Sequence, residues 1–114
     1  MSSFNSLNKV MLLGCLGRDP EIKFFDNGGS VCSFSIATSE SFKKNEKWEE
    51  RTEWHRISVF NKTAEACSTY LKKGSSVYVE GRMQTRSYQD KDGVEKFITE
   101  IVAYEVKFLD KKGE

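Results

Sequence analysis

The chain has 114 residues, with 18 lysines and arginines against 17 aspartates and glutamates, and a formal net charge of +1. This length suits a single domain that can close a hydrophobic core, and it is too short for two such domains. The balance of charge excludes a globally basic surface, so any affinity for nucleic acid must come from local clusters of cations combined with aromatic stacking.

The cysteine pattern and the lack of a long apolar run narrow the class of protein further. Cys15, Cys32 and Cys67 are odd in number and widely spaced, without the short Cys or His spacing of a zinc site. We therefore expect the three cysteines to act as small buried hydrophobic residues, in a protein of a reducing compartment with no bound metal or cofactor. No apolar run is long enough to cross a membrane, and residues 1–5 lack the features of a secretory signal, so we expect a soluble intracellular protein.

The first predicted element is a strand over residues 8–16, which is apolar enough to be largely buried. Gly14 and Gly17 indicate bends of the kind that a small barrel needs at its corners. A turn over residues 17–20 leads into further extended structure over residues 21–25. We interpret the two segments as halves of one bent strand.

A tight turn over residues 26–29, which contains two adjacent glycines, precedes the next predicted strand over residues 31–38. Alternation in this strand separates an apolar face from a face of serines, namely Cys32, Phe34 and Ile36 against Ser33 and Ser35.

Residues 39–51 form a polar stretch that we expect to be a long loop without structure of its own. Loops of this length are uncommon in compact domains and are often functional. Phe42, Lys43 and Trp48 place aromatic rings beside cations, which suits contact with a nucleic-acid strand. The alternative is a solvated hairpin whose glutamates cancel its lysines.

Residues 52–60 are rich in aromatic and β-branched residues and predict a strand. One face carries Trp54, Arg56 and Phe60, whereas the other face is mostly apolar and suits a core. The first face spans about 20 Å at the usual rise of a strand, which is room for roughly three extended nucleotides. The alternative is a solvated strand whose aromatic side chains are incidental or buried between subunits.

A helix is predicted over residues 61–74, with Asn61 as its N-cap, lysines in its last turn and Gly74 just beyond its end. Its apolar side consists of Ala64, Cys67 and Leu71.

Two long strands over residues 76–88 and 97–109 follow, joined by a turn over residues 90–93. Alternation places four polar or aromatic side chains of the first strand on one face: Arg82, Gln84, Arg86 and Tyr88. We expect residues 110–114 to be a short fraying tail.

This order of elements predicts an all-β domain with one short helix. A single helix between the third and fourth of five strands is the arrangement of the OB-fold, a five-stranded Greek-key barrel, here with long hairpin loops. The predicted domain covers residues 1–109. The fold alone does not define the function, because the same barrel carries oligonucleotide, oligosaccharide and protein ligands.

Several short motifs, in order along the chain, resemble those of the bacterial and organellar single-stranded-DNA-binding proteins. They are Asn8-Lys9-Val10 with Gly14-x-x-Gly17-x-Asp19-Pro20, Asn27-Gly28-Gly29, Ala37-Thr38-Ser39-Glu40-Ser41-Phe42, Thr52-Glu53-Trp54-His55-Arg56, Tyr70-Leu71-Lys72-Lys73-Gly74 and Val79-Glu80-Gly81. The match extends from Asn8 to Leu109 without gross gaps and is highly specific. It implies a homotetramer of OB domains around which single-stranded DNA wraps, without its base sequence being read.

The resemblance implies DNA contacts for particular aromatic and basic side chains. Trp54 and Phe60 match the family's stacking aromatics, and Phe42 and Tyr88 lie where many relatives have a stacking tryptophan. Trp48 is a further candidate that we expect to pack on DNA or on a neighbouring tetramer. The implied phosphate contacts are Arg56, Lys62, Lys43, Lys73, Arg86 and Lys96.

His55 resembles a histidine of the family's subunit interface, and the alternative is a histidine satisfied inside one subunit. Bacterial relatives usually continue through a flexible linker to an acidic tip that recruits replication and repair proteins, whereas this chain stops at Glu114. It is therefore either a truncated form or a tailless form like the mitochondrial relatives, and recruitment of such partners is left open. The resemblance implies a role in DNA replication, recombination and repair, in the cytoplasm at the nucleoid or in an organellar matrix.

Two other classes of protein compete with this interpretation. A nuclease would need metal ligands or an activated nucleophile, and the chain has a single histidine, scattered cysteines and carboxylates mostly flanked by lysines, so we expect no enzymatic activity. An OB-fold adaptor that mainly binds proteins, such as a primosomal accessory factor, would be expected to have fewer exposed rings on the strand face.

Overall fold

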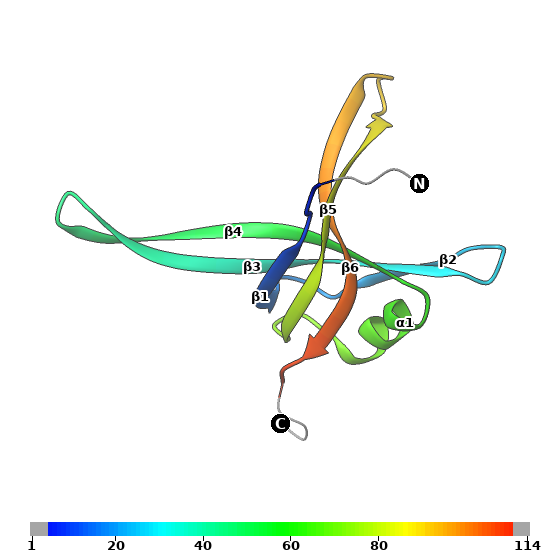
Figure 1. The fold of residues 1–114 in the computed structure, drawn as a ribbon, viewed down its shortest axis with the longest axis horizontal. Coiled ribbons are helices and arrows are strands. Elements are labelled where there is room, and N and C mark those ends of the chain that lie inside the picture. The colour runs from blue at the N-terminus through cyan, green and yellow to red at the C-terminus, as the bar shows by residue number, and fades with distance from the viewer. Residues whose placement is uncertain (1–4, 111–114) are drawn as a thin grey trace.

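The computed structural model describes residues 5–110 of the chain. Six strands and one helix follow each other along the chain: β1 (Val10–Leu16), β2 (Glu21–Phe24), β3 (Ser30–Lys44), β4 (Lys47–Phe60), α1 (Asn61–Tyr70), β5 (Ser76–Gln89) and β6 (Glu95–Phe108). Figure 1 shows a barrel from which the β3–β4 hairpin and the β5–β6 hairpin project in different directions.

The sheet closes on itself, which confirms the predicted OB-fold barrel with one short helix. The strands follow the order β1-β5-β6-β4-β3-β2, and β1 also pairs with β3. Both β1 and β2 pair with β3, β1 at Ile36 and Ala37 and β2 along residues 30–33. They therefore act as two halves of one bent strand, as predicted, and the barrel has five strands.

Close approach of β1 to β3 depends on a glycine at the bend. A Cβ atom at Gly14 would lie 2.3 Å from the carbonyl oxygen of Ala37, a distance that real Cβ atoms essentially never show. Because glycine has no Cβ atom, the two backbones can pair here and close the barrel.

The core contains the alternating apolar faces that the sequence predicted. Ile36, Ile57 and Val59 are fully buried, and Ala64 and Cys67 of α1 pack against them in one cluster. The alternation of β3 is also confirmed, since Cys32 and Phe34 are buried whereas the serines between them are only partly so.

The expectation of an unstructured loop over residues 39–51 is wrong, and the alternative of a hairpin is right. β3 and β4 stay paired as far as Lys44 and Lys47, and the chain reverses at Asn45 and Glu46, both of which have positive φ. We call residues 39–52 the β3–β4 arm. The sequence of the arm shows no apolar alternation because both faces of the arm meet solvent. Backbone hydrogen bonds between two such strands cannot be recognised from the hydropathy of their side chains.

The helix differs from its prediction at both ends. Phe60, not Asn61, is the N-cap, and no side chain caps the helix. Asn61 has a φ of 57°, and its Oδ1 atom instead accepts a hydrogen bond from the backbone N–H of Ser30 at 3.3 Å. The helix ends at Tyr70, so the predicted lysines follow the last turn and the N–H of Lys73 donates to Asp19 Oδ1 at 2.8 Å.

Strand β1 is not buried throughout, contrary to the prediction. Its side chains alternate, and Met11 and Leu13 are 61% and 63% exposed. Cys15 lies on the same exposed side, with its Sγ atom 3.4 Å from Ser76 Oγ, so the expectation that all three cysteines are buried is also wrong. The apolar composition of β1 predicted burial of both faces, because composition does not say what covers each face of a strand.

The predicted C-terminal tail lies mostly outside the described residues. Residues 1–4 and 111–114 lie outside the described residues, so most of the predicted tail is not described. Asp110 is described, and its Oδ1 atom accepts a hydrogen bond from the backbone N–H of Ser76 at 3.0 Å. Among residues 5–110, no helix reaches the length and apolarity needed to span a bilayer.

Candidate nucleic-acid interface

The outward face of the β3–β4 pair forms a groove. Strand register sets Ser35 opposite Arg56 and Ala37 opposite Trp54, on the side away from the core. Three adjoining cavities follow this face: Ser35 and Arg56 both line the first, Arg56 also lines the second, and Ser35 also lines the third. We call this feature the β3–β4 groove and define it by Gly17, Ser35, Trp54, Arg56, Phe60 and Arg86.

At one end of the groove the indole of Trp54 lies on backbone. A Cβ atom at Gly17 would be 2.5 Å from the Trp54 ring, so the missing side chain of this glycine makes room for the indole. Trp54 is still 57% exposed. The ring is therefore supported on one side and accessible from solvent, which is the geometry that a stacking platform requires.

The middle and the other end of the groove carry a cation and a second ring. Arg56 is exposed, and it has no ion-pair partner within the part of the chain that the structure describes. Phe60 is 45% exposed and lines a cavity of about 430 Å³ together with Arg56, Lys23 and Arg86. Two accessible rings thus bracket an unpaired guanidinium on one strand, as the sequence predicted.

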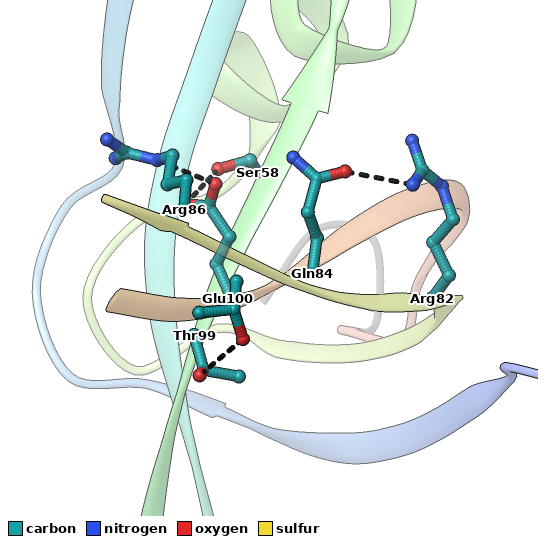
Figure 2. A network of polar contacts seen from close by, with 7 residues as sticks. Ser58, Arg82, Gln84, Arg86, Thr99 and Glu100 are labelled. Carbon is teal, nitrogen blue, oxygen red and sulfur yellow. Dashed lines mark hydrogen bonds and ion pairs between the residues drawn. The ribbon is translucent and has the colours of Figure 1, made fainter. Parts of the chain in front are cut away.

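The floor of this cavity holds a carboxylate that the sequence reasoning missed. Glu100 is only 6% exposed, and Figure 2 shows it reaching both Arg86 and Ser58. Its Oε2 atom accepts from Arg86 Nε at 3.0 Å, and its Oε1 atom accepts from Ser58 Oγ at 3.3 Å. The predicted cation Arg86 is therefore paired with an anion inside the groove.

Sequence reasoning also missed Arg18, which lines two of the cavities, and Lys23, which lines the cavity that contains Arg56 and Phe60. The signal available in the sequence was weak. Arg18 follows Gly17 in a predicted turn, and Lys23 belongs to a short strand, in which alternation says little about the face that each side chain occupies. Only the pairing of β2 with β3 brings Lys23 next to the serine face.

The two aromatic residues of the β3–β4 arm lie on different sides of it. Trp48 pairs with Lys43, on the side that continues the Trp54 face, and is 73% exposed. Phe42 pairs with Glu49 on the opposite side, where the guanidinium of Arg51 lies 4.8 Å from its ring centroid. The structure therefore brings Trp48 and Lys43 into line with the groove but not Phe42.

The β5–β6 hairpin supplies the remaining aromatic residue. We call residues 85–98 the β5–β6 arm. Tyr88 is 46% exposed and pairs directly with Lys96, on the same alternating face as Arg86. These side chains extend the polar wall of the groove away from the barrel.

All predicted cations are exposed, but they are spread over five elements and the turn after α1. Lys62 follows Phe60 by two residues in the first turn of α1, and Lys73 is held beside the turn before β2 by its bond to Asp19. Lys43 and Lys96 belong to the two arms. The positive charge therefore forms a rim around the rings of the groove rather than one continuous patch.

His55 lies on the face opposite Trp54, as alternation predicted. Its Nε2 atom is 2.8 Å from Thr38 Oγ1, and it lines a separate small cavity with Glu40, Arg51 and Glu53. The side chain is partly exposed, so one ring nitrogen is satisfied while the ring remains accessible.

A second surface combines apolar and charged groups on the outside of β1 and β5. Leu13 pairs with Tyr78, and Met11 pairs with Glu80. Lys9 Nζ lies 3.0 Å from Glu80 Oε2, and this hydrogen bond raises the pKa of Lys9 and lowers the pKa of Glu80. We call these five residues the β1–β5 face.

Desolvation, together with the hydrogen bond that its hydroxyl donates to Glu80 Oε1 at 3.0 Å, raises the pKa of Tyr78. Among residues 5–110, no group of three or more His, Cys, Asp or Glu side chains is placed to hold a metal ion.

The closed barrel, its helix and its ring-lined groove define an OB-fold domain. The chain belongs to the single-strand binding protein family, whose model matches residues 7–109.

Similar proteins agree with this assignment. Two proteins named single-stranded DNA-binding protein, from Neisseria meningitidis serogroups A and B, are each 54% identical to this chain over 110 residues, which is 96% of its length. The chain spans 63% of the length of these relatives. A solved structure described as Plasmodium falciparum SSB in complex with single-stranded DNA has a TM-score of 0.84 and 37% identity, and the match covers 96% of this chain and all of the other.

Proposed function

We propose that this chain binds single-stranded DNA in the β3–β4 groove without reading its sequence, and so protects it during replication, recombination and repair. The observation that carries this proposal is the pair of half-exposed rings, Trp54 and Phe60, on either side of the unpaired Arg56. Every base offers a face to such rings, so stacking tolerates any sequence. The names of the relatives and the DNA complex of the structural neighbour support it.

The proposed contacts divide into stacking and charge. Stacking is assigned to the exposed rings along the groove and its arms, namely Trp54, Phe60, Trp48 and Tyr88, with Phe42 reached only by a strand that crosses the edge of the β3–β4 arm. Phosphates are assigned to Arg56 in the middle of the groove and to the exposed cations at the rim, which are Lys62, Lys43, Lys73 and Lys96, and Arg86 lies lower in the groove.

We further propose that the domain assembles as a homotetramer. The β1–β5 face presents Met11 and Leu13 to solvent, and an exposed apolar patch of this kind marks a contact surface. His55 lies outside the groove, so its assignment to a subunit interface does not conflict with DNA binding. We assign the protein to the cytoplasm, at the nucleoid, with an organellar matrix as the alternative.

Titration with oligothymidylate and with duplex DNA of equal length, at several salt concentrations, tests the binding proposal. Paired bases cannot stack on the rings, so the single strand should bind more tightly and should quench Trp54 fluorescence. Trp54→Ala should weaken binding by about 1–3 kcal/mol at every salt concentration. Arg56→Gln should instead flatten the slope of log K against log salt by about 0.7.

Tyr70→Ala is the matched control for Trp54→Ala. Tyr70 is 68% exposed, but it lies on α1 against Phe108, outside the groove. Its removal should leave the affinity unchanged. Equal binding of duplex and single strand, or parent affinity in Trp54→Ala, would show that the groove is not the DNA platform.

A further inference from the structure

Glu100 is a buried carboxylate at the floor of a groove that is proposed to bind a polyanion. It lines the same cavity as Phe60 and Arg56, so its charge faces the space that the strand would occupy. A carboxylate in this position repels phosphate, because the two groups carry charges of the same sign. Its presence therefore restricts how a strand can lie in the groove.

The charge of Glu100 is compensated by one partner. Arg86 lies diagonally across the β5–β6 pair from Glu100, and its Nε atom is the donor of the 3.0 Å ion pair. The Arg86 side chain is 51% exposed, against 7% for that of Glu100. Arginine has five N–H donors, and within residues 5–110 only the one on Nε is used, so the Nη donors remain available to a ligand.

The pair thus offers hydrogen bonds without net charge. Each oxygen of Glu100 has already accepted one hydrogen bond, and an oxygen of a carboxylate has room for a second. Gln84, which pairs directly with Glu100, accepts from Arg82 Nη1 at 2.8 Å through Oε1 and keeps its amide donors, as Figure 2 shows. Donors and acceptors lie side by side, which suits a base edge, and base edges carry both.

From this geometry we propose that Glu100 determines which side of the strand faces the protein. It makes the floor of the groove a site for base edges, keeps phosphates at the cationic rim, and converts Arg86 from a phosphate contact into a base contact. Glu100 is a specificity-determining residue for bases against backbone, although not for one base against another. This inference rests on the proposed function.

The test compares two variants of one strand, Glu100→Gln and Glu105→Gln. Both remove one negative charge from β6, but Glu105 is exposed and does not line the cavity. In Glu100→Gln the guanidinium of Arg86 loses its counterion and should attract a phosphate, so the slope of log K against log salt for oligothymidylate should steepen by about 0.7. Glu105→Gln should leave the slope unchanged, and Arg86→Gln combined with Glu100→Gln should restore the parent slope.

A second measurement uses an abasic strand of deoxyribose phosphate with the same length. The parent should prefer oligothymidylate over this strand, and Glu100→Gln should reduce that preference by about fivefold, the worth of one net hydrogen bond. If Glu100→Gln does not fold, Arg86→Gln carries the test: it should weaken binding but flatten the salt slope by less than half as much as Arg56→Gln does.

Failure of this inference is distinguishable from failure of the proposed function. If the parent does not bind oligothymidylate at any salt concentration, the proposed function is wrong. If the parent binds, and Glu100→Gln has the slope and the base preference of Glu105→Gln, Glu100 only supports the fold. An Arg86→Gln variant that flattens the slope as much as Arg56→Gln would also overturn the inference.

Discussion

Trp54 is positioned by a residue that has no side chain. Its indole fills the volume that a Cβ atom of Gly17 would occupy, which holds the ring against the turn between β1 and β2. A ring held in this way loses little freedom when a base stacks on it, so more of the stacking energy remains as affinity. Gly17 therefore belongs to the proposed binding surface, although it offers no side-chain contact of its own.

Gly17→Ala should weaken binding of single-stranded DNA while changing thermal stability little. The added methyl group displaces the Trp54 ring, and the loss cannot exceed the roughly 1–3 kcal/mol that one stacked base contributes. Fluorescence titration with oligothymidylate measures the affinity, and a thermal melt measures the stability.

The control for Gly17→Ala is the same substitution in the Trp54→Ala background, where no ring remains to be displaced. The double variant should bind as Trp54→Ala alone does, because two residues in contact are not additive. Additive losses would mean that Gly17 acts on the strand directly.

The central side chains of the site could be found from the sequence, and their partners could not. Period-two alternation identified Trp54, Arg56 and Phe60 as one face, and the structure agrees. Glu100 was missed because nothing within β6 sets it apart from the other glutamates of that strand. Its importance comes from pairing with β5 and β4, which are non-local contacts that alternation does not encode.

At the scale of elements, the β3–β4 arm was the hardest to predict. Its residues lack an apolar face, so the polar composition suggested a loop, whereas the turn at Asn45 and Glu46 supplies the two positive φ values of a two-residue hairpin connection. Cross-strand contacts then hold it, such as the ion pair between Arg51 and Glu40 at 3.6 Å. Backbone hydrogen bonds between β3 and β4, rather than burial of side chains, stabilise the β3–β4 arm.

Replacing residues 40–51 by Asn-Gly, so that the turn follows the Ser39–Thr52 pair, should leave the barrel folded. None of the removed residues belongs to the buried core, and the inserted pair suits a type I′ turn. Binding of a short oligomer of about three nucleotides should be unchanged, because the Trp54–Phe60 groove remains. Binding of long oligothymidylate should weaken, and a lower affinity for both lengths would mean that the arm shapes the groove.

The core between the helix and the barrel contains two buried thiols, Cys67 of α1 and Cys32 of β3. Burial, and to a lesser degree the neighbouring Cys32, raises the pKa of Cys67 from its ordinary 9.0 to about 12. Burial also raises the pKa of Cys32. Both groups stay as neutral thiols where the unfolded chain would ionise them.

Stability should therefore fall on the alkaline side. The contribution of Cys67 is complete below pH 9.0, where both states hold the proton, and is lost as pH rises toward about 12. Urea unfolding between pH 8 and pH 10.5 measures the slope. Cys67→Ala, which has no proton to lose, should show a shallower decline, and an equal decline would assign the effect to other groups.

At the scale of the whole molecule, the groove and the β1–β5 face share no residue, although β5 contributes to both. The groove is built mainly on β3 and β4, with Arg86 from β5, whereas the β1–β5 face is built on the antiparallel pair of β1 and β5. The Lys9–Glu80 ion pair sits at the margin of Met11 and Leu13, an arrangement common to contacts with an apolar centre and a polar rim. Self-association through this face would leave the groove open.

Leu13→Glu should reduce the mass of the assembly, since it places a charge in the centre of the proposed contact. Sedimentation at micromolar concentration measures the mass, and circular dichroism checks that the barrel is intact. Leu7→Glu is the matched control, because Leu7 is 87% exposed and is not part of the β1–β5 face. Parent mass in Leu13→Glu would remove this face from the assembly.

The length of β3 has a consequence for how such a domain can diverge. One continuous strand, Ser30–Lys44, is barrel wall along its first half and arm along its second (Figure 1). Insertions or deletions in register at the tip therefore change how far the protein reaches along a bound polymer, yet they alter no residue on which folding depends. The length of the arm and the ability of the domain to fold can therefore change independently during evolution.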